Sequence, residues 1–143
     1  MLGRMVERQE LENGRIRYKA GRCEVEMTLP APHVALLRYK GYAPAEIVEP
    51  LIADASELVA RVGPMRVFID ATDMHGYDSA FRTRFAEWYR EQQGKVTGVM
   101  LLQSGLLRMA VQFVNLFGGA AIEPVSNRAE FERRLQEAVR AVP

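Results

Sequence analysis

Residues 66–89 constrain the fold more than any other part of the chain. Their first residues belong to an apolar run, residues 65–69, whose β-branched and aromatic members are typical of a strand buried on both faces. A polar segment, residues 70–78, follows. Apolar side chains then recur at helical spacing at Phe81, Phe85, Trp88 and Tyr89. The stretch predicts a buried strand, a short polar loop and an amphipathic helix, which is the corner of an α/β protein where ligands and regulatory contacts gather.

The remainder of the second half repeats this alternation of strand and helix. Residues 96–102 predict a second buried strand and residues 105–117 a helix that ends at Gly118. Residues 120–125 predict a short strand, which Pro124 assigns to a sheet edge because proline lacks the backbone donor. Asn127, followed by Glu130, has the spacing of a capping box and begins the last helix. Parallel pairing through right-handed crossovers is therefore expected in this half.

The first half predicts antiparallel strands and one helix. Residues 15–19 and 23–29 alternate apolar with polar side chains around a tight turn, and residues 34–41 form a more apolar and therefore more central strand. A helix follows over residues 44–62, in which Pro50 is tolerated only within about the first turn. We predict residues 1–14 to be a polar leader and residues 15–143 to be a single domain.

Composition excludes several classes of protein. The chain has 143 residues, 48% of them hydrophobic, which suits one globular domain, and a net charge of +1, which gives no bulk attraction for nucleic acid. Cys23 is the single cysteine, so no intramolecular disulfide is possible and a reducing compartment is indicated. The first ten residues contain no apolar core of signal-peptide length, so we do not expect secretion, and the sequence has no uninterrupted apolar run long enough to cross a membrane. We therefore expect a cytoplasmic protein.

The helix at residues 105–117 is unusually apolar. Arg108, Gln112 and Asn115 make one narrow polar stripe, and the remaining surface is hydrophobic. One interpretation is that a partner or a second copy of the chain covers part of this surface, giving a homodimer. The other is that the helix lies between two neighbouring elements of its own domain. The surface residues that we assign to a ligand or dimer contact here are Leu107, Val111, Val114, Phe113 and Phe117.

Residues 67–79, Val-Phe-Ile-Asp-Ala-Thr-Asp-Met-His-Gly-Tyr-Asp-Ser, resemble the strand-loop-helix signature of STAS domains, the anti-sigma-factor antagonists and their relatives. Residues 104–117 and 127–139 resemble the helices that follow in that family. The resemblance implies a single STAS-like α/β domain with a mixed β-sheet, parallel βαβ units and about four helices. The chain departs from the family pattern at Ala80-Phe81 and in the His75-Gly76-Tyr77 loop, and the wider SpoIIAA-like group accommodates these departures.

The resemblance also implies a function. The implied function is that of a non-enzymatic regulatory module. A partner kinase phosphorylates a serine of the module, here Ser79, and the charge of that serine decides which protein the module binds. We place partner binding at the corner between the buried strand and the next helix, at Asp73, His75, Tyr77, Asp78 and Arg82. The same residues have a purely structural interpretation, because Asp78 or Ser79 can accept hydrogen bonds from free N–H groups at a helix start.

Two other hypotheses remain open. The first is a carrier or sensor of a small apolar ligand or lipid, with Trp88, Phe113 and Phe117 lining a cavity. The second is an enzyme that uses Asp70, His75 and Asp78. Asp70, Asp73, His75 and Asp78 match no specific metal loop, and glycine-rich phosphate loops and nucleophile elbows are missing, so we predict no metal and no cofactor.

Overall fold

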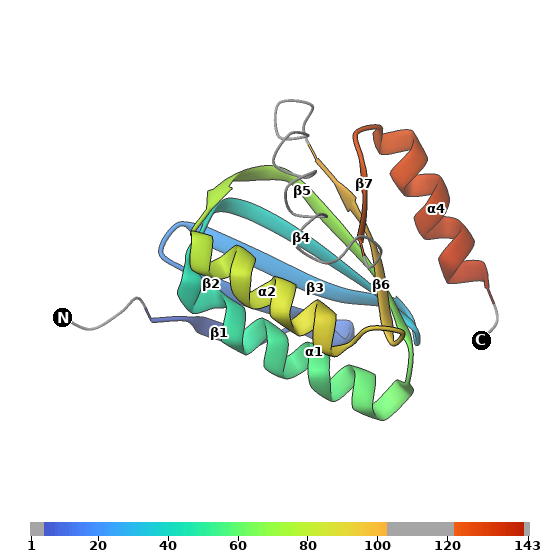
Figure 1. Cartoon of the computed structure of the whole chain (residues 1–143), viewed down its shortest axis with the longest axis horizontal. Coiled ribbons are helices and arrows are strands. Elements are labelled where there is room, and N and C mark those ends of the chain that lie inside the picture. The colour runs from blue at the N-terminus through green and yellow to red at the C-terminus, as the bar shows by residue number, and fades with distance from the viewer. Residues whose placement is uncertain (1–4, 103–121, 142–143) are drawn as a thin grey trace.

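The structure, a computed structural model, describes residues 5–102 and 122–141. These residues form a seven-stranded sheet, with its strands in chain order, and the helices that pack on it (Figure 1). The strands are β1 (Glu7–Glu10), β2 (Ile16–Ala20), β3 (Cys23–Ala31), β4 (Val34–Ala43), β5 (Met65–Tyr77), β6 (Val96–Leu101) and β7 (Ile122–Val125). The α-helices are α1 (Val48–Val62), α2 (Ser79–Glu91) and α4 (Arg128–Arg140), and the 3₁₀ turns are η1 (Glu12–Gly14) and η2 (Ala45–Ile47).

The sheet is mixed, as predicted. Strands β1 to β4 pair antiparallel, whereas β4 to β7 pair parallel. Strand β4 lies in the middle of the order, which confirms the central position predicted for its apolar sequence. Within the segment predicted to be a polar leader, residues 7–10 form β1 and pair with β2, so the sheet begins earlier than the first predicted strand.

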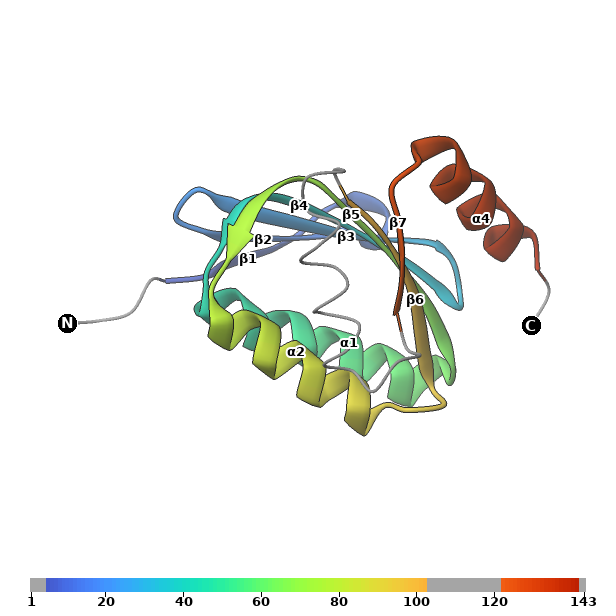
Figure 2. The ribbon, with the colours of Figure 1, turned by 45° about the horizontal axis from the view of Figure 1, so that its top comes forward.

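Helices cover the two faces of the sheet unequally. Both α1 and α2 lie on one face, and α4 lies on the other near β6 and β7 (Figure 2). The larger apolar core fills the space under α1 and α2, with contributions from all of β2 to β6. A smaller core joins α4 to the sheet, and its members are Val34, Leu36, Phe68, Val99, Leu101, Phe131, Leu135 and Ala138. Within the described residues, every helix is too short or too polar to cross a membrane.

Local sequence signals explain where the helices begin and end. Pro50 is the third residue of α1, inside the first turn, where a missing N–H breaks no helical hydrogen bond. Gly63 ends α1 with φ +86°, a conformation that favours glycine, and its N–H bonds the Val59 carbonyl at 2.9 Å. The Asn127 side chain accepts from the Glu130 N–H at 3.1 Å and so caps α4, as predicted. Pro124 lies in edge strand β7.

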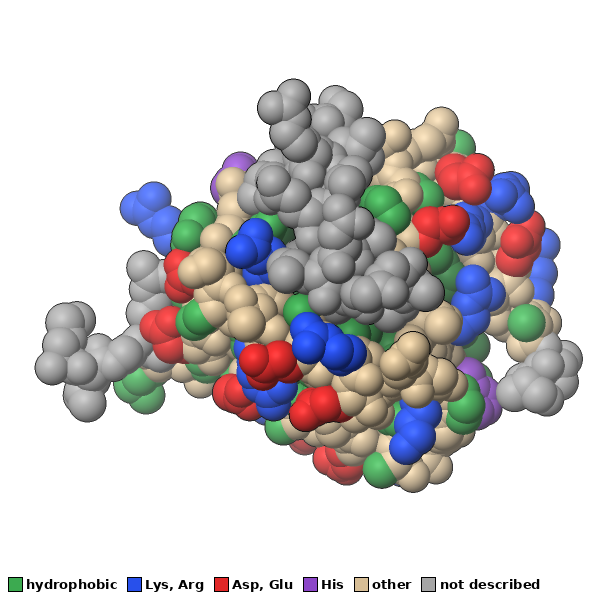
Figure 3. All heavy atoms as spheres, in the orientation of Figure 1, with side chains coloured by type: hydrophobic (Ala, Val, Ile, Leu, Met, Phe, Trp, Pro, Cys, Tyr) green, Lys and Arg blue, Asp and Glu red, His purple; other side chains and the backbone are tan. Residues whose placement is uncertain are grey.

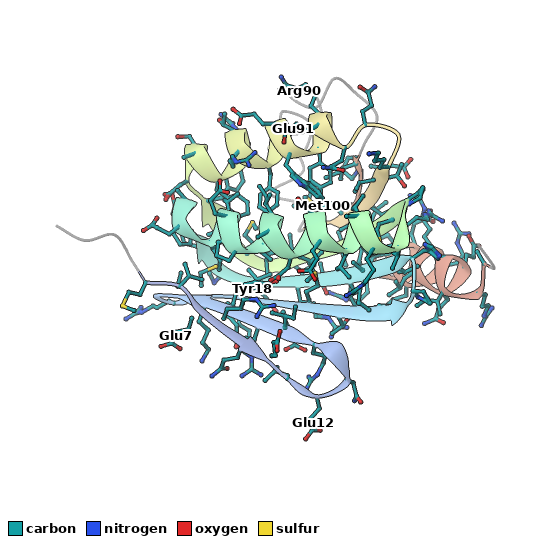
Figure 4. The ribbon with its side chains drawn as sticks, turned by 90° about the horizontal axis from the view of Figure 1, so that it is seen from below. Glu7, Glu12, Tyr18, Arg90, Glu91 and Met100 are labelled. Carbon is teal, nitrogen blue, oxygen red and sulfur yellow. The ribbon has the colours of Figure 1, made fainter. Side chains whose placement is uncertain are left out.

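A partly buried polar contact connects α1 to the antiparallel half of the sheet. Tyr18 of β2 is fully buried and points toward α1, whereas Glu7 lies on the opposite side of the β1–β2 hairpin (Figure 4). The Tyr18 hydroxyl donates to Asp54 at 2.5 Å, and Arg8 binds the same carboxylate at 2.8 Å. Burial, reinforced by the Asp54 carboxylate, raises the pKa of Tyr18, so the hydroxyl stays protonated and donates.

The structure differs from the sequence-based expectations in two further places. The polar loop predicted over residues 70–78 is wrong, because β5 continues to Tyr77 and pairs with β4 as far as Ala43. The polar side chains there are interspersed with Ala71 and Met74, which are buried in the core under α1 and α2. The described residues contain three α-helices against about four predicted, and the predicted helix at 105–117 lies outside the described residues.

Candidate functional site

The candidate site forms where β5 runs into α2. Between Asp70 and Tyr77, β5 contains two more residues than the stretch of β4 that it pairs with, so the register shifts twice. Extra residues of this kind bend a strand and increase its twist. The bend carries the end of β5 toward the start of α2. We call the set of predicted residues placed there the α2 corner: Asp73, His75, Tyr77, Asp78, Ser79 and Arg82.

Asp78 joins three segments at this corner. It occupies the N-cap position of α2, but its side chain makes no hydrogen bond to that helix. Its carboxylate instead accepts from the Ala45 N–H of η2 at 2.9 Å, and its own N–H donates to the Ala43 carbonyl at 2.9 Å. The expectation that Asp78 caps its own helix is therefore wrong. The residue holds the start of α2 against the end of β4.

Ser79 is the first residue of α2 and is exposed. Within the described part of the chain, its side chain has no hydrogen-bond partner. Arg82, one turn later, is only partly exposed, and its Nε atom is buried without a hydrogen-bond partner among the described residues. The corner thus presents an accessible hydroxyl at a helix N-terminus, with a guanidinium three residues along the same helix.

Aromatic packing fixes the backbone around the hydroxyl. Phe81 is buried and packs against Tyr77 in a stacked arrangement, with ring centroids 6.0 Å apart, and against Tyr39 edge to face. The large side chain that departs from the family pattern therefore points into the core. His75 is exposed, and next to it Gly76 lies so close to the Tyr42 ring that an added Cβ would approach it to 3.1 Å.

Asp70 has a structural role that the sequence indicated only in part. Its carboxylate accepts from the N–H and the hydroxyl of Thr72, at 3.1 and 2.7 Å, and from Arg128 of α4 at 3.2 Å. Burial alone would raise the pKa of Asp70, but the bonds from Thr72 and Arg128 outweigh it and hold the pKa below its ordinary value. The bonds from Thr72 join residues that are close in sequence, whereas the link to α4 was not predicted. An arginine in the first turn of a helix, where the dipole disfavours a cation, is the signal that could have revealed it.

The acidic and histidine side chains proposed for chemistry do not converge. Asp70 is bound to Arg128, and Asp78 to the η2 backbone, while His75 and Asp73 are exposed. Across residues 5–102 and 122–141, no three His, Cys, Asp or Glu side chains gather in a metal-binding arrangement.

Trp88 belongs to the core. It is 3% exposed, and its indole N–H donates to the Ser56 hydroxyl at 2.8 Å, which joins α2 to α1. It lines an apolar cavity of about 30 Å³. A cavity of this size holds about one water molecule and is far smaller than a typical ligand site. The other residues predicted for an apolar ligand or dimer contact lie outside the described residues: Leu107, Val111, Phe113, Val114 and Phe117.

Comparison with known proteins identifies the fold. No family model and no curated protein sequence matches the chain. Among solved structures, the anti-sigma factor antagonist SpoIIAA in its unphosphorylated form is 16% identical and has a TM-score of 0.59, covering 78% of this chain and 97% of its own. The Bacillus cell fate determinant SpoIIAA in its phosphorylated form is 15% identical, with a TM-score of 0.57 and coverage of 77% and 98%.

A third structure covers more of the chain. It is an uncharacterized DUF3478-family protein with a SpoIIAA-like fold from Shewanella loihica PV-4, 12% identical with a TM-score of 0.55, and the match spans 93% of both chains. Identities this low report the fold and leave function open. The predicted STAS/SpoIIAA-like α/β fold is confirmed, and the chain is a SpoIIAA-like domain in architecture.

Proposed function

We propose that this protein is a non-enzymatic regulatory module that binds a protein partner, of the anti-sigma-factor or kinase type, through the α2 corner. Phosphorylation of Ser79 switches that binding. The observation that carries the proposal is the position of Ser79, exposed at the first residue of α2 and directly beyond a strand of the sheet. The likeness to SpoIIAA, whose structure is known in phosphorylated and unphosphorylated forms, supports the same assignment.

The electrostatics of the corner suit a switch that acts on the surface. A phosphate on Ser79 would add about two negative charges beside the positive end of the α2 dipole and three residues from Arg82. Asp78 adds one opposing charge, but its carboxylate is already engaged by Ala45. Phosphorylation is therefore expected to change what the corner binds and to leave the fold intact.

Modification is tested by mass spectrometry. Wild-type protein and the variants Ser79→Ala and Thr83→Ala are isolated from the native host, and intact masses are measured. Thr83 is the matched control because it is an exposed hydroxyl one turn further along α2. We expect one added phosphate on wild type and on Thr83→Ala, and none on Ser79→Ala. An unmodified Ser79 under all growth conditions would remove the switch.

Partner binding is tested separately, by affinity capture with wild type, Ser79→Asp and His75→Ala. We expect wild type to capture a partner protein that Ser79→Asp does not capture, because the added negative charge imitates the phosphate. His75→Ala, an exposed substitution in the same corner, should weaken the same interaction. Equal capture by all three proteins would exclude the α2 corner as the binding surface.

The other predicted roles depend on residues 105–117. A lipid or apolar-ligand carrier would need a larger cavity than the one that Trp88 lines, and the remaining residues assigned to it lie outside the described residues. Homodimer formation through the same helix also stays a prediction. Light scattering of the wild-type protein decides it, since an uncovered apolar helix face should give a dimer.

A further inference from the structure

A basic hollow lies at the end of the sheet opposite the α2 corner, where β5 and β6 begin. Its volume is about 220 Å³, and α4 contributes its last residues to the wall. Three of the lining side chains are basic, and they come from three separate segments: His33 before β4, Arg66 in β5 and Lys95 before β6. Thr97, directly opposite Arg66 in the parallel pairing of β5 and β6, adds a hydroxyl.

The charges in this hollow are uncompensated. Within the described residues, no aspartate or glutamate lines it, and neither Arg66 nor Lys95 takes part in an ion pair. Several cations on the helices do have acidic partners. Arg84 on α2 pairs with Glu49, and Arg133 on α4 pairs with Glu130 and Glu137. Figure 3 shows acidic and basic side chains side by side over these helices.

Helix dipoles do not account for the surplus. Helices α1, α2 and α4 all end near this end of the sheet, and each contributes a partial negative charge of about one half. Each also has its own arginine in its last turn, namely Arg61, Arg90 and Arg140. These arginines match the dipoles, so Arg66 and Lys95 remain as excess positive charge beside the hollow.

We infer that this hollow binds a small phosphate-class oxyanion, either orthophosphate or a phosphomonoester. Two unpaired cations match the charge of a phosphate dianion. Arg66 supplies a planar fork that suits two phosphate oxygens, and its guanidinium lies 5.6 Å from the Phe68 ring centroid, which restricts its orientation. Lys95 supplies a second charge, and the Thr97 hydroxyl supplies an uncharged donor. The inference is independent of the α2 corner.

The test is a titration of the ¹⁵N-labelled full chain with orthophosphate, followed by two-dimensional NMR at constant ionic strength. We expect saturable shifts at the amides of Gly94, Lys95, Thr97 and Arg66. Arg66→Gln and Lys95→Gln should each weaken binding by about tenfold, which corresponds to about 1.4 kcal/mol. Both side chains are exposed, so both variants should fold. The matched control is Arg38→Gln, an exposed arginine on β4 that does not line the hollow, and it should bind as wild type does.

Two further titrations define the ligand. Phosphoserine as the free amino acid should bind more tightly than orthophosphate if the natural ligand is a phosphomonoester, and equally or less tightly if it is free phosphate. Acetate should produce no saturable shift at these amides. Shifts that do not saturate, an equal response to acetate, or unchanged binding by both variants would overturn the inference.

Discussion

The two faces of the sheet differ in how much apolar surface they bury. Under α1 and α2, the inward side chains of β2 to β6 form one continuous apolar core. On the other face, the described residues form one smaller apolar core, which lies beneath α4. Beyond α4, the residues paired across β1 to β5 carry alternating charges, in the order Glu7, Lys19, Glu24, Lys40 and Asp73. We call these five residues the charged row.

This difference shows that a strand has apolar side chains on the faces that helices cover and polar side chains on the face that no described helix covers. The antiparallel strands need one apolar face only, because no described helix covers their second face, whereas β5 and β6 need two. It also shows that α4 is attached through a smaller contact, which the Asp70–Arg128 pair supplements. We therefore expect the α1/α2 face to determine global stability and the α4 face to respond locally.

The largest expected effect is the loss of a core side chain on the α1/α2 face. Leu51 of α1 is 2% exposed, and Leu51→Ala should lower the free energy of unfolding by about 2–5 kcal/mol in urea titrations. Leu135 of α4 is 6% exposed and is the matched control. Leu135→Ala should cost less, since a helix packed on one side can shift to fill the space, and should accelerate hydrogen exchange mainly in α4. Equal losses would contradict the proposed division between the faces.

An intermediate effect is expected from the pair that fastens α4. Arg128→Gln leaves the Asp70 carboxylate, which is 8% exposed, with Thr72 as its remaining partner, at a cost of about 1–2 kcal/mol. Because the folded-state pKa of Asp70 is lowered, its contribution is present above the unfolded pKa and is lost as the pH falls through the folded value. Wild type should therefore lose more stability than Arg128→Gln between about pH 5 and pH 2.

The control for this pair is Arg133→Gln. Arg133 is an exposed arginine further along α4, and its ion-pair partners, Glu130 and Glu137, belong to the same helix. The substitution should leave the acid dependence of unfolding unchanged. A steeper acid dependence in Arg128→Gln than in wild type would contradict the role assigned to the pair.

Much of the fold could be predicted from the sequence, because its signals are local. Hydrophobic periodicity placed β2 to β7 and the three described α-helices but missed β1, while Gly63 marked the end of α1 and Asn127 the start of α4. The polar end of β5 was predicted as a loop because its side chains lack alternation. That stretch is a strand only because β4 lies beside it to Ala43, and pairing between segments far apart in sequence has no local signal.

The candidate site could be predicted in its location but not in its bonds. Ser79 was placed correctly at the start of a helix, since the strand before it and the apolar spacing after it are both local patterns. The partner of the Asp78 carboxylate, Ala45, and the partner of Asp70, Arg128, lie 33 and 58 residues away in the sequence. Such contacts depend on how the layers pack, so periodicity and spacing could not have identified them.

The smallest effect is expected in the charged row, and it tests the comparison most directly. Lys40 lies between Glu24 and Asp73 on neighbouring strands, and all three side chains are at least partly exposed. Lys40→Gln should change the free energy of unfolding by about 0.5 kcal/mol or less, because exposed charge pairs lose in side-chain entropy most of what they gain in attraction. The change should shrink at high salt, where screening removes the attraction. If urea titrations instead gave a salt-independent loss as large as that of Leu51→Ala, this face would be a packed surface, and the contrast between a covered and an open side of the sheet would fail.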